Sequence, residues 1–244
     1  MSSGLRIAAA YSIPSFALGF CGPQDKKSRK ILFDFVSGKS GLEKKVRKIF
    51  EQFEAAYHYY QLIAKKNNIA DPLNEKVVKA FWVGNSLLEK ITSEDLKRLI
   101  MTDFCRPGLL TKKEAEERVK MVRPGALPHH SFHVLVLGAI AGRVKLEGAM
   151  LDLCRPGWGR VIEIQSSKFK VQNYRPLVLG KKIKLGREIE KEISWDKKIV
   201  PDVKVGDWVS FHWGQACEVL TPQEVKDLKH YTQKTIDLLN KVGN

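Results

Sequence analysis

A cysteine that precedes a glycine-rich turn is the first feature of the chain that could do chemistry. Cys154 is followed by Arg-Pro-Gly-Trp-Gly at residues 155–159, and an alternating, β-branched run begins at residue 160. This order predicts that the thiol lies at the mouth of a strand, where it can reach a ligand. As a thiolate, Cys154 could hold a soft metal or act as a nucleophile. Trp158 and Gly159 would then lie beside the site.

Three histidines form a dense imidazole cluster in the segment Pro-His-His-Ser-Phe-His at residues 128–133. His129 and His133 share a side in either strand or helix geometry, whereas His130 joins His133 only in a helix. The spacing differs from the zinc motif HExxH, because no glutamate lies between the histidines. Together with Cys154 and His212, the cluster would complete a mixed nitrogen and sulfur site suited to iron or zinc. The alternative is that these histidines are structural.

The remaining cysteines and two tryptophans are weaker candidates. Cys21 precedes a Gly-Pro turn and could join the site, although a turn cysteine is commonly inert. Cys217 follows His212 at a spacing that places the two on opposite faces of a regular strand, so we expect Cys217 in the core. Trp213, with Trp158, could wall a pocket at the site. The 4 cysteines form no CxxC pair, which predicts free thiols rather than a zinc ribbon or a disulfide scaffold.

The composition allows a sizeable core and argues against several classes of protein. The chain has 244 residues, of which 43% are hydrophobic and 28% charged. It contains no apolar run long enough for a membrane span, and the apolar stretch at residues 7–20 is broken by Pro14 and lacks a signal-peptide pattern. We therefore expect a cytoplasmic protein without a membrane segment. The sequence contains no Walker A, GxGxxG or GxSxG motif.

The net charge of +15 would suit a nucleic-acid binder. However, lysine and arginine are interleaved with glutamate, for example at residues 43–48 and 114–118. This pattern indicates solvated helix faces, and we do not expect nucleic acid to be the main partner.

The first half of the chain is predicted to be mainly helical. Apolar residues recur every three or four positions over residues 42–64, and further helices are expected to begin at Asp71, Thr92 and Thr111. Residues 1–30 form a mixed segment. The apolar run at residues 134–140 fits a buried strand or a buried helix, and we favour the strand.

The second half predicts a small barrel followed by a helix. Strand-like runs occupy residues 160–165, 168–172, 177–179, 183–185, 189–193, 208–213 and 216–220, separated by turn residues. Thr221 begins the final helix. The predicted fold class is thus α+β, with a mainly helical domain at residues 1–148 and a small OB-like β-barrel with a C-terminal helix at residues 149–244.

Two stretches of the second half resemble the HypC/HupF family, the small-barrel chaperones of [NiFe]-hydrogenase maturation. In that family a cysteine is followed at matching spacing by a glycine and a Val-x-Glu-Ile strand, as Cys154 is by Gly159 and residues 161–164. The family also has a Val-Gly-Asp-Tyr-Val-x-Val-His-x-Gly-x-Ala pattern, and residues 205–216 read Val-Gly-Asp-Trp-Val-Ser-Phe-His-Trp-Gly-Gln-Ala. The resemblance covers residues 150–240. The family's cysteine is an N-terminus, whereas Cys154 is internal.

This resemblance implies that Cys154 holds the iron of an Fe(CN)2CO group and that His212 lies close to it as ligand, base or hydrogen-bond partner. It implies a HypD-like maturation protein or a hydrogenase large subunit as partner. We therefore expect an accessory protein for [NiFe]-hydrogenase maturation or related metallocentre assembly, with zinc as the alternative metal. A Cys154-dependent or metal-dependent enzyme and a basic OB-like nucleic-acid-binding module are the alternatives. The whole chain also resembles an uncharacterised prokaryotic family that has the Pro-His-His-Ser-Phe-His segment.

Overall fold

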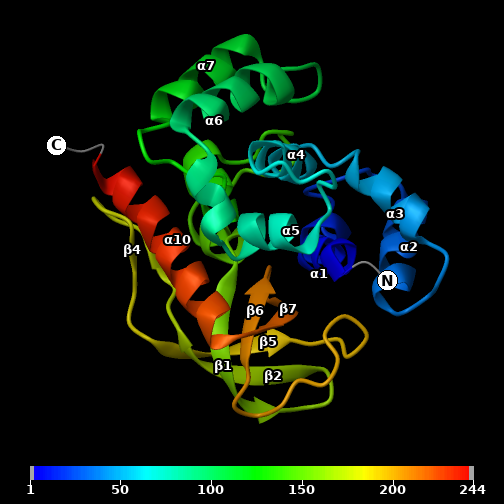
Figure 1. The fold of residues 1–244 in the computed structure, drawn as a ribbon. Coiled ribbons are helices and arrows are strands. Elements are labelled where there is room, and N and C mark those ends of the chain that lie inside the picture. The colour runs from blue at the N-terminus through cyan, green and yellow to red at the C-terminus, as the bar shows by residue number, and fades with distance from the viewer. Residues whose placement is uncertain (1–2, 242–244) are drawn as a thin grey trace.

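The computed structural model describes residues 3–241. The helical elements are α1 (Ser3–Ala17), α2 (Lys26–Val36), α3 (Glu43–Phe50), α4 (Ala56–Lys66), α5 (Glu75–Trp82), η1 (Ser86–Lys90), α6 (Ser93–Leu99), η2 (Ile100–Phe104), α7 (Lys112–Met121), α8 (His130–Phe132), η3 (His133–Leu137), α9 (Ala149–Cys154) and α10 (Pro222–Asn240). The strands are β1 (Gly157–Ile164), β2 (Lys168–Tyr174), β3 (Leu177–Val178), β4 (Lys184–Leu185), β5 (Ile189–Ser194), β6 (Trp208–His212) and β7 (Gln215–Leu220). Figure 1 shows the helices gathered on one side of the strands, with α10 running alongside both. The predicted α+β class and C-terminal helix are confirmed.

Local sequence signals explain where several helices begin. Thr92, Thr111 and Thr221 each accept a hydrogen bond from the backbone three residues later, and the acidic side chain at that position accepts one from the threonine N–H. These reciprocal bonds satisfy amide groups that the first helical turn leaves free. The three predicted helix starts are therefore confirmed.

Other helix predictions need correction. Residues 1–30 contain a buried helix, α1, which the sequence pattern did not reveal because its apolar residues occupy nearly every side. The stripe over residues 42–64 is divided into α3 and α4. Asp71 does not cap α5, since Asn74 accepts from the N–H of Lys76 at that helix start and Asp71 pairs with Arg47 instead. The run at residues 134–140 is not a strand, because most of it continues α8 as the short π-helix η3.

Five strands form one sheet in the order β1-β2-β5-β7-β6, and β1 also pairs with β6, so the sheet closes on itself. All its pairings are antiparallel except that of β5 with β7. Strands β3 and β4 pair separately. Each strand predicted in the second half of the chain is present within a few residues of its expected range.

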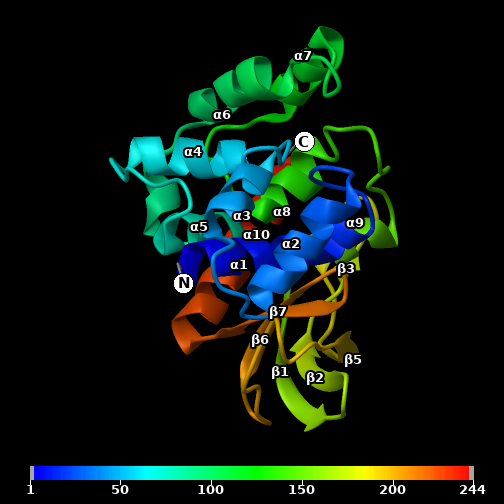
Figure 2. The same ribbon diagram turned by 90° about the vertical axis from the view of Figure 1, so that its right-hand side faces the viewer.

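The helical and strand-containing halves share one cluster of buried hydrophobic side chains. Helix α1 packs on β6 and β7, and α10 packs on α8, as the second view shows (Figure 2). The division into domains at residue 148 stays a prediction. What matters for the site is that α1, α8, α9 and β6 meet in this shared interior.

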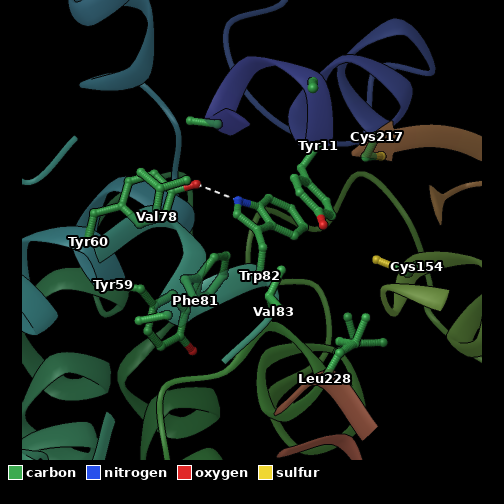
Figure 3. Close-up of a cluster of buried hydrophobic side chains, with 14 of the residues drawn as sticks. Tyr11, Tyr59, Tyr60, Val78, Phe81, Trp82, Val83, Cys154, Cys217 and Leu228 are labelled. Atoms are coloured by element: carbon green, nitrogen blue, oxygen red, sulfur yellow. Dashed lines mark hydrogen bonds between the residues drawn. The ribbon is translucent and has the colours of Figure 1, made fainter. Parts of the chain in front are cut away.

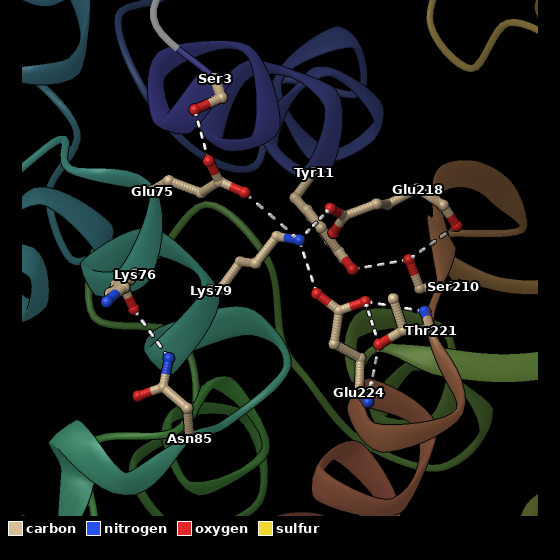
Figure 4. A network of polar contacts seen from close by, with 10 residues as sticks. All are labelled: Ser3, Tyr11, Glu75, Lys76, Lys79, Asn85, Ser210, Glu218, Thr221 and Glu224. Carbon is tan, nitrogen blue, oxygen red and sulfur yellow. Dashed lines mark hydrogen bonds and ion pairs between the residues drawn. The ribbon is translucent and has the colours of Figure 1, made fainter.

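A partly buried lysine also ties the two halves together (Figure 4). The Lys79 Nζ on α5 lies 3.0 Å from a carboxylate oxygen of Glu218 on β7, 2.5 Å from one of Glu224 on α10 and 3.5 Å from one of Glu75. One ammonium cannot neutralise three carboxylates. The pKa of Glu218 is raised to about 7, mainly by burial and further by the charges of Glu224 and Glu75, although the attraction of Lys79 opposes the rise.

Replacing Lys79 with methionine is expected to destabilise the protein by about 3 kcal/mol at pH 8, because Glu218 and Glu224 would stay partly buried without their cation. The loss should be smaller at pH 5, where protonation removes the carboxylate repulsion. Urea unfolding at both pH values measures the difference. Lys76→Met, at an exposed position of the same helix, is the control and should change stability by less than about 0.5 kcal/mol. Equal effects of the two substitutions would contradict this account.

Candidate metal centre

Three buried side chains from separate elements meet in the shared interior. His130 begins α8, Cys154 ends α9 and His212 ends β6. One nitrogen of each histidine and the Cys154 sulfur all lie within 4.8 Å of one another. The three residues are 6%, 6% and 1% exposed. We call this set the His-Cys-His group.

His212 is fixed by the tight turn that joins β6 to β7. Trp213 and Gly214 form the turn with φ angles of 51° and 73°, a left-handed conformation typical of two-residue hairpins. The Trp213 N–H donates to the carbonyl of Leu153 at 2.8 Å, which attaches the turn to the residue before Cys154. The His212 Nδ1–H donates to the Tyr11 carbonyl at 2.7 Å. Its Nε2 therefore carries a lone pair, and this buried atom has no partner among residues 3–241.

His130 is held by its backbone position and by Trp82. The His129 Nδ1 accepts from the Ser131 N–H and so caps the helix that His130 begins. The His130 ring lies 4.1 Å from the Trp82 ring, between centroids. In Figure 3 the Trp82 N–H points to Tyr60, so Trp82 does not offer this donor to Cys154. The indole thus serves as an apolar wall.

The His130 ring also contacts Cys154 directly. Its Nε2 lies 3.0 Å from the Cys154 carbonyl oxygen and 4.0 Å from the sulfur. A carbonyl only accepts, so this nitrogen carries the proton in the metal-free protein. The other ring nitrogen, Nδ1, is buried without a partner in the described part of the chain. Unpaired buried nitrogens are costly, which makes them candidates for metal ligation.

Burial keeps all three groups uncharged in the absence of a metal. It lowers the pKa of His212 to about 4 and that of His130 well below its usual value, where the neighbouring histidines act in the same direction. Burial also raises the pKa of the Cys154 thiol well above its usual value. The Trp213 indole N–H opposes that rise by lying near the sulfur. Metal binding would therefore release the thiol proton but none from the histidines.

The distances suit a mononuclear ion after a small contraction. In a tetrahedral site with bond lengths near 2.0 Å to nitrogen and 2.3 Å to sulfur, a nitrogen and a sulfur ligand are about 3.5 Å apart. The Cys154 sulfur and one nitrogen of each histidine lie within 4.8 Å of one another. Side-chain rotations that shorten the longest of these separations by about an ångström would close the difference.

The other predicted histidines lie outside the His-Cys-His group. His129 packs with its ring 5.9 Å from that of Tyr231 and uses Nδ1 to cap α8. The His133 Nδ1 lies 3.4 Å from the Tyr59 hydroxyl. Burial lowers the pKa of His129 to about 3 and that of His133 to about 4. Both are therefore neutral, buried side chains in the metal-free protein.

Of the residues predicted to lie beside Cys154, some line the site and others do not. Cys21 and Trp213 line the cavity next to Cys154, whereas Trp158 and Gly159 do not. Trp158 stacks under the Arg155 guanidinium, and a Cβ at Gly159 would meet Val171 at 2.6 Å. Cys217 is buried, as expected, and its thiol donates to the Gln215 carbonyl.

Tyr11 and Trp82 complete the site and were missed by sequence reasoning. Tyr11 supplies the carbonyl that sets the His212 tautomer. Its position on a helix that the sequence pattern concealed left no signal for this contact.

A family model covers residues 1–244 and is described as "Family of unknown function (DUF6390)". The chain belongs to this family. DUF6390 membership agrees with the expected whole-chain relationship to an uncharacterised family. No curated protein and no solved structure matches the chain. None of the comparisons supports the resemblance to the HypC/HupF family.

Within residues 3–241, no helix of this DUF6390 chain is both long and apolar enough to cross a bilayer. The expected cytoplasmic location stays a prediction.

Proposed function

We propose that the protein binds one transition-metal ion through His130, Cys154 and His212. The observation that carries the proposal is the convergence of a buried thiol with two buried imidazoles whose free nitrogens lack partners in the described chain. Buried polar atoms without partners destabilise a fold, and a metal would satisfy them. The backbone contacts of His212 and His130 resemble the hydrogen bonds that orient metal-ligating histidines.

The donor set favours zinc or iron. Two imidazoles and one thiolate suit both metals, whereas calcium and magnesium prefer oxygen ligands. The Fe(CN)2CO group is a narrower proposal that rests on the HypC/HupF resemblance alone. Zinc is the alternative.

A role in [NiFe]-hydrogenase maturation or related metallocentre assembly is a second proposed function. It is favoured by one observation, namely that Cys154 and His212, which come from two separate motifs, belong to the same group. The closed five-stranded sheet is compatible with an OB-like barrel. A HypD-like protein or a hydrogenase large subunit would be the partner.

An enzyme with a metal-free Cys154 nucleophile fits the site less well. The thiol is 6% exposed and burial raises its pKa, so little reactive thiolate would form at neutral pH. A metal-dependent enzyme would use the same three ligands. The nucleic-acid module has only the net charge of +15 in its favour.

A Co²⁺ titration of the metal-free protein tests the proposal. We expect saturation at one equivalent, with visible bands typical of tetrahedral cobalt and a near-ultraviolet thiolate-to-cobalt charge-transfer band. About one proton should be released for each ion bound at pH 7, and the affinity should rise about tenfold per pH unit below the thiol pKa. Binding without the charge-transfer band would contradict ligation by Cys154.

A further inference from the structure

The His-Cys-His group supplies three ligands, and a tetrahedral ion takes four. Within residues 3–241, no further histidine, cysteine or carboxylate belongs to the group. Structural zinc sites have four protein ligands, whereas sites with three keep a position for an exogenous ligand.

A cavity of about 60 Å³ adjoins the group and is lined by all three of its residues. The rest of its wall is largely apolar and is made of aromatic side chains and residues of the chain segment 139–146, among others. A single water requires about 15 Å³ of such volume, so the cavity has room for roughly four water-sized atoms. This volume excludes a nucleotide or a peptide and fits a ligand of a few heavy atoms.

Two hydrogen-bond donors in the cavity wall are unused. The Ser12 hydroxyl and the Trp213 Nε1–H are buried, and neither has a partner within the described ranges. The charged group in the wall, Glu54, is already paired with Arg143, and it also accepts from the Gly22 N–H. The cavity therefore offers free donors in an otherwise apolar space, and a ligand with an acceptor atom would satisfy them.

The charge of the loaded centre selects among small ligands. A divalent ion with one thiolate and two neutral imidazoles carries a net charge of +1, and an uncompensated charge in an apolar interior is unfavourable. A monoanion at the fourth position would make the centre neutral.

We propose that the fourth coordination position faces this cavity and takes a small monoanion of about three heavy atoms, whose far end accepts a hydrogen bond from the Trp213 indole N–H. This inference rests on the proposed metal site. The Ser12 hydroxyl is the second donor. The class includes azide and formate.

Azide titration of the Co²⁺-loaded protein tests the inference. We expect a saturable change in the cobalt visible bands, while the thiolate charge-transfer band is retained. Trp213→Phe keeps a ring against Phe20 but removes the N–H, and the cobalt-saturated variant should bind azide about tenfold more weakly than the cobalt-saturated natural protein. Trp208→Phe, whose residue does not line the cavity, is the matched control and should bind azide as the natural protein does.

The alternative outcomes are distinguishable. Absence of the cobalt spectrum itself would overturn the metal site rather than the fourth position alone. A normal cobalt spectrum that azide leaves unchanged would overturn this inference. Azide binding only after Cys21→Ala would do the same, because it would identify Cys21 as the fourth ligand. Azide binding by cobalt-saturated Trp213→Phe as tight as by the natural protein would overturn the hydrogen bond from the Trp213 N–H to the anion.

Discussion

Replacing Cys154 with serine is expected to weaken Co²⁺ or Zn²⁺ binding by about 100-fold or more and to remove the thiolate charge-transfer band. The expectation follows from the free energy of a site with three protein ligands, of which each contributes about 3 kcal/mol or more. The serine hydroxyl is nearly isosteric but does not ionise at neutral pH. Competition with a chromophoric chelator measures the affinity.

Cys217→Ser is the matched control. Cys217 is also a buried cysteine, and its thiol donates to the Gln215 carbonyl at 3.3 Å, a bond that a serine hydroxyl can keep. For substitutions of the ligands His130 and His212, the corresponding control is His129→Asn. It removes a buried imidazole outside the group while retaining a side-chain cap. Equal loss of metal in Cys154→Ser and Cys217→Ser would contradict the assignment of the ligand.

Lowering the pH from 7 to 5 is expected to destabilise the metal-free protein by several kcal/mol. The four buried histidines at positions 129, 130, 133 and 212 all have a lowered pKa, because burial disfavours the imidazolium. In the unfolded chain each would have a pKa near 6.5. The unfolded state therefore binds more protons between pH 6.5 and 4, and stability is lost as the pH falls through this window.

The expected loss at pH 5 is about 2 kcal/mol for a histidine with a folded-state pKa of about 4, such as His212. Glu218 acts in the opposite direction, because its folded-state pKa of about 7 exceeds the unfolded value near 4.5, so the folded protein takes up this proton as the pH falls from 7 to 5 while the unfolded chain largely does not. One carboxyl offsets only part of the effect of four imidazoles. Urea unfolding at pH 7, 6 and 5 measures the slope, and His129→Asn should reduce it by about one proton. A stability that is flat from pH 7 to 5 would contradict the neutral, buried state of these histidines.

The sequence predicted much of the sheet and part of the metal centre. Alternating β-branched runs and turn residues located the strands, because a half-buried strand has a two-residue period that survives in the sequence. Cys154 and His212 were proposed together from two motifs, and the structure places both in one group.

The remaining parts of the site depend on tertiary contacts that no local pattern encodes. His130 enters the group because residues 130–132 are helical, whereas the adjoining apolar run suggested a strand. Tyr11 acts through a backbone carbonyl, which any residue type could supply. Trp213 adopts a left-handed conformation that its residue type disfavours, so the turn beside His212 could not be read from composition.

X-ray absorption at the metal edge of the Zn²⁺- or Co²⁺-loaded protein tests the central claim most directly. The account predicts one sulfur scatterer at about 2.3 Å, two imidazole nitrogens at about 2.0 Å and one further light atom. The sulfur contribution should disappear in Cys154→Ser and persist in Cys217→Ser. A first shell made only of nitrogen and oxygen in the natural protein would contradict the claim that Cys154, His130 and His212 hold the metal.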